Sequence, residues 1–165
     1  TINTLGKHNI LNALAAIAVG NHFGVPVETA VKQLMQFKGQ RQSIRESNGY
    51  TVIDDTYNAS PDSMKASLSI LDTMKGKNHK VAVLADMLEL GENSPLYHKE
   101  VGTYLAGTSI TYLFAVGDLI DHTIAEVKEK NPSVIVRKFD DNESLTAALQ
   151  EFLQPGDAVL LKGSN

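Results

Sequence analysis

Two acids, a phenol and an amide stand close together in residues 54–58, which read Asp-Asp-Thr-Tyr-Asn. The apolar residues 50–53 before them are typical of a buried strand, and Ser60 with Pro61 after them is typical of a capped helix start. In an open parallel sheet, ligands bind at the carboxyl ends of strands, where such loops meet helix N-termini. These side chains could hold a ribose, a metal-bound phosphate or an amine. Alternatively, the acids are turn residues and Tyr57 covers the helix.

Charged and glycine residues also follow three later predicted strands. Because the carboxyl ends of parallel strands meet at one edge of a sheet, these loops together predict a crevice, although each loop alone is common in any α/β protein. The candidate residues there are Asp86, Glu89, Gly117, Lys162 and Ser164. His98 follows the loop of residues 85–91 and could reach the same edge, but a lone helical histidine is more often a surface or capping residue. We assign it no catalytic role.

A second candidate site lies near the start of the sequence. Asn9 and Asn12 are three residues apart and therefore share one face of an Ala-rich helix. The amide of asparagine carries both a donor and an acceptor, so it can pair with the edge of an adenine. From the residues alone, helix capping by His8 or Asn9 is the better interpretation.

Composition limits the classes of protein to consider. A chain of 165 residues with 42% hydrophobic content can bury one core, with a second small element beside it. The formal net charge of -4 and the pI near 5.7 argue against a nucleic-acid or anionic-membrane surface. The absence of cysteine excludes disulfides and thiolate metal sites. No stretch has the pattern of a membrane span or a signal peptide, so a cytoplasmic location is the default expectation.

The first forty residues differ from the rest. Residues 9–23 and 27–37 have helical apolar spacing with Gly24 between them, and this predicts a helical hairpin. The apolar surface of the two helices exceeds what a pair can cover, so we expect them to pack on something else. Residues 38–41 are interpreted as a linker. Two short strands then flank Asn48-Gly49, which is the strongest short-range signal for a β-hairpin.

Beyond the hairpin, helices and strands alternate. Predicted helices cover residues 61–74, 95–106, 119–130 and 143–153, and predicted strands cover residues 80–84, 111–116, 134–138 and 158–161. Such connections are right-handed crossovers between parallel strands, with helices on both faces of the sheet. The predicted fold is α/β, a Rossmann-like, doubly wound and mostly parallel sheet preceded by an α-helical hairpin. The sequence contains no Gly-x-x-x-x-Gly-Lys-Ser/Thr loop and no Gly-x-Gly-x-x-Gly fingerprint, so it offers no recognisable triphosphate cradle.

Four separated motifs resemble the ATP-dependent Mur ligases of peptidoglycan synthesis. Residues 6–16 are similar to the family's Gly-x-His-Asn-x-x-Asn-x-x-Ala-Ala helix. Residues 54–64 are similar to Asp-Asp-Ser/Thr-Tyr-Asn-Ala-Asn-Pro-Asp-Ser-Met, a segment of the branch that adds D-alanyl-D-alanine, with Ser60 in place of the second Asn. Residues 86–91 resemble the Gly-Asp-Met-x-Glu-Leu-Gly block from its second residue on, and residues 156–164 resemble the closing strand.

The resemblance implies a division of the chain and a reaction. Residues 1–40 would be the last helices of a central ATPase domain plus a linker, and residues 41–165 the C-terminal Rossmann-like domain. The full-length enzyme would use ATP and Mg²⁺ to phosphorylate the tripeptide carboxylate of UDP-N-acetylmuramoyl-tripeptide, and the amine of D-alanyl-D-alanine would attack the acyl phosphate. The rest of the same polypeptide would supply the phosphate loop and the metal ligands, so this chain alone would be inactive and would hold no catalytic residue.

The resemblance also implies roles for individual residues. Asn9 and Asn12 would face the adenine, and Arg41 would reach the phosphates. Asp55, Tyr57 and Asn58 would hold the ribose or the ring, with Asp55 favoured over Asp54 because it is nearer Tyr57. The dipeptide would be framed by the loops that carry Asp86, Glu89, Gly117, Lys162 and Ser164.

Two other interpretations remain open at this point. Another ligase of the Mur or folylpolyglutamate type would share the fold, although the sequence of residues 57–59, Tyr-Asn-Ala, differs from the signature of those branches. A receiver-like phosphoacceptor domain also places paired acids after an early strand and a lysine after the last one. It would need an Asp at the end of the third parallel strand, where this sequence has Val116 and Gly117 before Asp118.

Overall fold

The computed structural model describes residues 7–36 and 43–164. The chain divides into two compact units, Thr1–Gln42 and Ser43–Asn165. In the described part of the first unit, helix α1 (Lys7–His22) is followed by helix α2 (Val27–Gln36). The turn between them uses Gly24 at φ +83°, and the amide of Val25 donates to the carbonyl of Gly20 at 2.9 Å. This is the left-handed helix end that glycine favours, as the sequence predicts.

The helical hairpin buries few of its own apolar side chains. Ala13 is 6% exposed, whereas Phe23 is 79% and Leu11 is 68% exposed within the chain. The other large apolar residues that are exposed on this unit are Ile10, Leu14, Val19, Val25, Val27, Val31 and Met35. The expectation that the two helices cannot cover their apolar surface alone is therefore confirmed.

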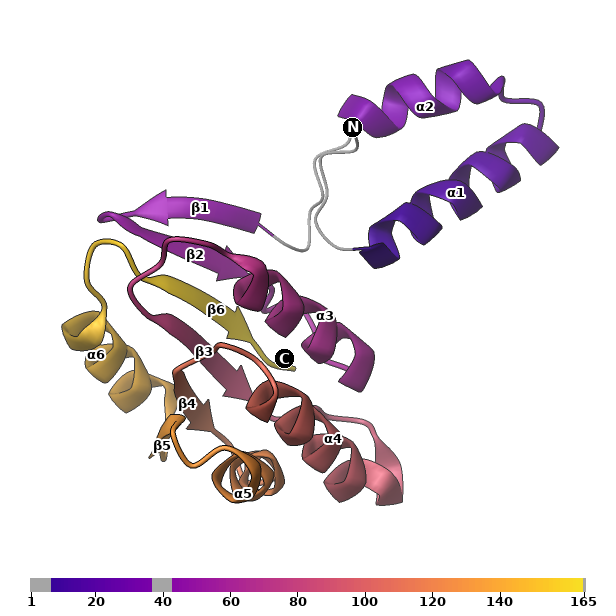
Figure 1. Ribbon diagram of the computed structural model, residues 1–165. Helices are drawn as coiled ribbons and strands as arrows, with labels where there is room; N and C mark the ends of the chain where they lie inside the picture. The colour runs from indigo at the N-terminus through magenta and orange to yellow at the C-terminus, as the bar shows by residue number, and fades with distance from the viewer. Residues whose placement is uncertain (1–6, 37–42, 165) are drawn as a thin grey trace. The chain divides into compact units, whose positions relative to one another are not determined.

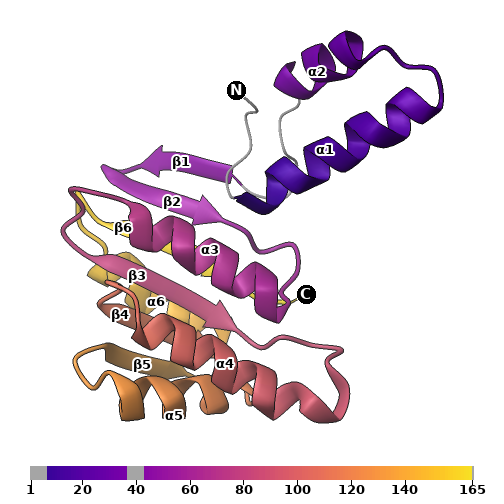
Figure 2. The same ribbon diagram turned by 45° about the vertical axis from the view of Figure 1, so that its right-hand side comes forward.

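The second unit is built on a six-stranded sheet with the order β1-β2-β6-β3-β4-β5 (Figures 1 and 2). Strands β1 and β2 pair antiparallel, and all other neighbours pair parallel. The strands are β1 (Ser43–Ser47), β2 (Tyr50–Asp54), β3 (Lys80–Ala85), β4 (Tyr112–Val116), β5 (Ile135–Phe139) and β6 (Ala158–Lys162). The α-helices are α3 (Pro61–Thr73), α4 (Ser94–Ala106), α5 (Ile120–Lys130) and α6 (Asn142–Phe152), with a short 3₁₀ helix η1 (Gly91–Asn93) before α4.

The helices form a layer on each face of this sheet (Figure 1). One core joins α3, α4 and α5 to one sheet face and includes Met64, Val101 and Ile124. A second core on the opposite face joins α6 to the sheet through Leu145 and Phe114. The first three crossovers run in one direction across the sheet and the crossover through α6 runs back, so opposite faces follow from a constant handedness. The predicted doubly wound, mostly parallel fold is confirmed.

The predicted element boundaries agree with the structure to within one or two residues. The β-hairpin turn has Asn48 at φ +51° and Gly49 at φ +83°, the two left-handed positions that a type I′ turn requires. Helix α3 begins with Pro61 after a capping box, in which Ser60 and Ser63 exchange hydrogen bonds. Both features place residues 54–60 where the sequence predicts them, in a loop between the end of a strand and the start of a helix.

Candidate functional site

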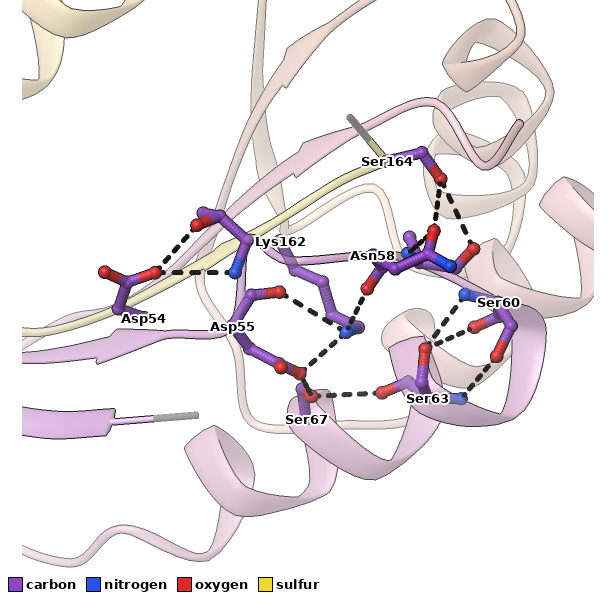
Figure 3. Close-up of polar contacts among 10 residues, drawn as sticks. Asp54, Asp55, Asn58, Ser60, Ser63, Ser67, Lys162 and Ser164 are labelled. Carbon is purple, nitrogen blue, oxygen red and sulfur yellow. Dashed lines mark hydrogen bonds and ion pairs between the residues drawn. The ribbon is translucent and has the colours of Figure 1, made fainter. Parts of the chain in front are cut away.

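The central contact of the candidate site joins the loop after β2 to the end of β6. Asp55 Oδ2 lies 2.6 Å from Lys162 Nζ, and the side chains of this ion pair are 15% and 1% exposed (Figure 3). The two residues meet because β2 and β6 are parallel neighbours whose carboxyl ends lie side by side. Ser67, on the first turns of α3, donates to the same carboxylate oxygen at 2.6 Å.

The structure distinguishes the two adjacent acids, a choice that the sequence leaves open. Asp54 turns toward β1, where Arg45 donates to its Oδ2 at 3.3 Å, and Thr56 Oγ1 donates to its Oδ1 at 2.9 Å. Asp55 faces β6 and α3 instead. Successive side chains at a strand end point to opposite sides. Asp55 is therefore the acid that belongs to the interior of the site.

Asn58 and Ser164 form a second tie between the same loops. Ser164 Oγ donates to Asn58 Oδ1 at 3.2 Å and accepts from the amide of Leu88 at 3.2 Å (Figure 3). The amide of Ser164 donates to the carbonyl of Asp86 at 3.1 Å. One serine thus touches the loops after β2 and β3, which the sequence can only place at the same edge of the sheet.

Asp86 has a structural role at this edge. Its carboxylate accepts hydrogen bonds from the backbone amides of Asp118, Leu119 and Ile120, at 3.1, 3.2 and 2.7 Å. These amides open helix α5, so Asp86 caps that helix from a neighbouring loop. Gly117, at φ +118°, leaves room for the contact, because a Cβ atom there would lie 2.4 Å from Asp86 Oδ1. The loop geometry therefore ties together two of the predicted dipeptide residues without any ligand.

Two of the predicted ligand residues are open to solvent. Glu89 is exposed and has φ +60°, a left-handed conformation that a non-glycine residue seldom adopts. The left-handed backbone of Glu89 is of a kind that clusters at ligand-binding loops, where the surrounding structure holds it in place. Tyr57 is 58% exposed. Glu89 and Tyr57 are thus side chains of the site that could meet a bound molecule.

His98 is buried, unlike the surface or capping residue that the sequence suggests. Its Nε2 accepts from the amide of Met87 at 3.1 Å, and its Nδ1 lies 2.8 Å from the carbonyl of Ser94. These partners require a neutral ring with the proton on Nδ1. The histidine therefore fixes the loop after β3 from inside.

The predicted adenine and phosphate residues belong to the first unit. Asn12 is exposed on α1, and its amide lies one helical turn from the backbone position of Asn9. The side chain of Asn9, and Arg41 as a whole, lie outside the described residues. Sequence reasoning missed Ser67, although its four-residue spacing from Ser63 on an otherwise apolar helix face was a usable signal.

A pocket of about 610 Å³ lies at the opposite edge of the sheet, at the amino ends of β3 and β4. Its wall includes Asp72, whose pKa is lowered by hydrogen bonds from the hydroxyl and the amide of Ser109 and, to a smaller extent, by the charge of Lys80. These bonds measure 2.6 and 2.7 Å. The pocket is therefore separate from the loops that carry the candidate residues.

No group of three or more His, Cys, Asp or Glu side chains in residues 7–36 and 43–164 is arranged to hold a metal ion. Within the same residues, none of the helices has the length and apolar character needed to cross a membrane.

Comparison with known proteins identifies the fold as one of a ligase family. The family model described as "Mur ligase, glutamate ligase domain" matches residues 40–165. The chain belongs to the Mur ligase family. The receiver-like interpretation is therefore discarded.

Similar proteins that match nearly the whole of this chain include one named for its activity and two structures of MurF. The UDP-N-acetylmuramoyl-tripeptide–D-alanyl-D-alanine ligase of Bacillus subtilis is 40% identical over 167 residues, which cover 99% of this chain and 36% of that protein. The structure of MurF from Acinetobacter baumannii has a TM-score of 0.82 and 31% identity, covering 99% of this chain and 36% of the other. MurF from Thermotoga maritima in complex with ADP has a TM-score of 0.78 and 30% identity, covering 97% and 35%. This chain spans about a third of the length of these Mur ligases.

Proposed function

We propose that this chain is the C-terminal part of an ATP-dependent amide ligase that joins D-alanyl-D-alanine to UDP-N-acetylmuramoyl-tripeptide. The main observation behind the proposal is a set of hydrogen bonds at the carboxyl edge of the sheet. Through them, Lys162 and Ser164 connect the loops that follow β2, β3 and β6. The choice of substrates is supported by the names of similar ligases that match nearly the whole of this chain. The first unit is proposed to be the end of a preceding ATPase domain, and its exposed apolar residues support this assignment.

In this proposal the nucleotide lies against the loop after β2. Asp55 accepts hydrogen bonds from the ribose hydroxyls, and Tyr57 and Asn58 flank the sugar or the ring. Asn9 and Asn12 face the adenine, and Arg41 reaches the phosphates. The related Thermotoga maritima protein was solved in complex with ADP, and this supports the use of an adenine nucleotide.

The dipeptide is proposed to lie beside the nucleotide, framed by the loops after β3, β4 and β6. The exposed carboxylate of Glu89 is available to the ammonium group of the dipeptide, and Ser164 and the backbone near Gly117 border the same space. Holding an amine against an acyl phosphate replaces a bimolecular encounter with a positioned one, and this is the main contribution that such a domain can make. A dipeptide amine must also lose a proton before it attacks.

Mg²⁺ neutralises phosphoryl charge in reactions of this kind. Among the described residues, no group of three or more His, Cys, Asp or Glu side chains could hold a metal ion. In the proposal, Mg²⁺ is bound by the rest of the polypeptide. We therefore expect the 165-residue chain alone neither to hydrolyse ATP nor to form the amide.

The test is amide formation by the full-length ligase that contains this chain. Purified enzyme is given ATP, Mg²⁺, UDP-N-acetylmuramoyl-tripeptide and D-alanyl-D-alanine, and the product and the released phosphate are measured together. We expect equal amounts of both, and neither product when D-alanyl-D-alanine is replaced by glutamate. Amide formation with glutamate but not with the dipeptide would instead support a folylpolyglutamate-type ligase.

A further inference from the structure

The ammonium group of Lys162 is enclosed by the loop after β2. The residue is 3% exposed, and its Nζ lies 2.6 Å from Asp55 Oδ2 and 3.0 Å from the carbonyl oxygen of Asn58. The carbonyl oxygen of Asp55 lies at 3.5 Å. An ammonium group has three protons, and these acceptors account for all of them. Lys162 therefore has no donor left for a substrate, although the sequence places it among the dipeptide contacts.

The same contacts determine which oxygen of Asp55 is available. Lys162 and Ser67 both donate to Oδ2 (Figure 3). Among the residues that the structure describes, no hydrogen bond to Oδ1 is found, and no buried polar side-chain atom lacks a partner. Oδ1 is therefore the oxygen that faces solvent. A carboxylate with one oxygen held by two donors cannot rotate freely about its last bond, so its free oxygen is presented in one direction.

We infer that Lys162 is a positioning residue for the nucleotide, which acts by holding Asp55 so that Oδ1 points toward the bound ribose. The inference rests on the proposed function, because it uses the proposed contact between Asp55 and the nucleotide. It replaces the dipeptide contact that the family resemblance implies for Lys162 with a support of the nucleotide contact. Three observations support this inference: the ammonium group is buried, it has no free donor, and it shares one oxygen of Asp55 with Ser67.

The charge of the pair explains why a lysine is needed there. An isolated buried ammonium is strongly unfavourable, so it requires a carboxylate and further acceptors at close range. In return, it fixes the carboxylate more firmly than a neutral donor can, because the attraction between opposite charges adds to the hydrogen bond. Ser67, a neutral donor to the same oxygen, is expected to contribute less to the orientation.

The test measures steady-state kinetics of the full-length ligase with Lys162→Met, which keeps a flexible apolar stem of similar length and removes the ammonium. We expect the KM for ATP to rise roughly tenfold to a hundredfold, since a hydrogen bond to a charged group is lost from the support of Asp55. The KM for D-alanyl-D-alanine should stay within about twofold. The matched control is Lys65→Met, which removes a lysine from an exposed ion pair with Glu100 at 2.8 Å on the same unit. It should leave both constants unchanged.

A double-mutant cycle with Asp55→Asn separates an indirect role from a direct one. If Lys162 acts through Asp55, Lys162→Met should raise the KM for ATP little further once Asp55 has been replaced, whereas a direct contact gives additive effects. Thermal unfolding of each variant is measured in parallel. Should Lys162→Met fail to fold, Ser67→Ala removes the second donor to the same oxygen and should raise the KM for ATP several-fold.

The inference is overturned if Lys162→Met raises the KM for the dipeptide and not that for ATP, or if its effect adds fully to that of Asp55→Asn. An unchanged KM for ATP in folded Lys162→Met would overturn it as well. Failure of the proposed function gives a different result, because the wild-type enzyme would then form no amide from ATP and the two substrates.

Discussion

Replacing Asp86 by alanine tests whether its carboxylate serves the fold or a ligand. The carboxylate accepts from the first backbone amides of α5, and Ile120, whose amide lies 2.7 Å away, is 0% exposed. If these contacts are the role of Asp86, the substitution should lower the free energy of unfolding even when no substrate is present. If Asp86 instead binds the dipeptide, its loss should leave the unfolding of the free chain nearly unchanged.

The size of the expected loss follows from two terms. Removing a side chain that caps a helix N-terminus costs about 0.5–2 kcal/mol. The buried amide of Ile120 is then left without an acceptor, which adds about 1–3 kcal/mol. Because the two terms overlap, we expect a total of about 2–4 kcal/mol. In a unit of this size, each kcal/mol shifts the melting temperature by about 4 °C, so the melting temperature should fall by roughly 8–16 °C.

The measurement is thermal unfolding of the 165-residue chain, followed by far-ultraviolet circular dichroism. The matched control is Asp118→Ala, since Asp118 lies in the adjacent loop and has an exposed side chain. The control should change the melting temperature by no more than about 2 °C, as is usual for surface substitutions. If Asp86→Ala melts with the wild type, while the full-length ligase carrying it loses affinity for D-alanyl-D-alanine, the capping role is refuted.

Three further predictions concern other parts of the chain. Gly117→Ala should lower the free energy of unfolding by about 2–4 kcal/mol, because φ is +118° and the new Cβ would lie 2.4 Å from Asp86 Oδ1. In urea unfolding, the loss should be smaller when Asp86 has already been replaced by alanine. Hydrogen bonds from Ser109 lower the pKa of Asp72, so the stability from this contact is present above about pH 4 and is lost as the pH falls through the lowered pKa of the folded state. Ser109→Ala should therefore lower the free energy of unfolding by less than about 1 kcal/mol at neutral pH and leave it unchanged in stronger acid. Urea unfolding at both pH values measures the difference. Phe23 is exposed in this chain, so Phe23→Gln should change its free energy of unfolding by less than about 0.5 kcal/mol. If the rest of the full-length ligase covers Phe23, the same substitution should destabilise that enzyme by about 1–3 kcal/mol in thermal unfolding. A small effect in both proteins would contradict the proposed packing of the first unit.

Local signals explain why the elements could be predicted from the sequence. Asn48-Gly49 has the two residues that tolerate left-handed backbone, and Ser60 with Pro61 defines the start of α3. Helices α4 and α6 begin with similar signals, a proline in the first turn and the capping Asp141, and helices and strands differ in their apolar period, 3.6 against 2. These are properties of a few neighbouring residues, so a single sequence is enough to place them within a turn.

The contacts of the candidate site depend on strand order, which local signals do not contain. Lys162 reaches Asp55 only because β6 lies beside β2, and the two residues are 107 positions apart. Asp86 caps α5 only because β3 and β4 are neighbours. The burial of His98 likewise depends on how the loop after β3 folds back over α4. From the sequence, these residues could be placed at one edge of the sheet, but it could not be predicted which of them form hydrogen bonds within the protein.

The position of β6 has a consequence for how the protein is made. This strand is the last of the described strands in chain order, yet it pairs with β2 on one side and β3 on the other. Until residues 158–162 have left the ribosome, the centre of the sheet is missing and two apolar strand edges have no neighbour. We therefore expect nascent chains that stop short of β6 to depend on chaperones or to aggregate, and we expect chains cut before residue 158 to fail to form the sheet.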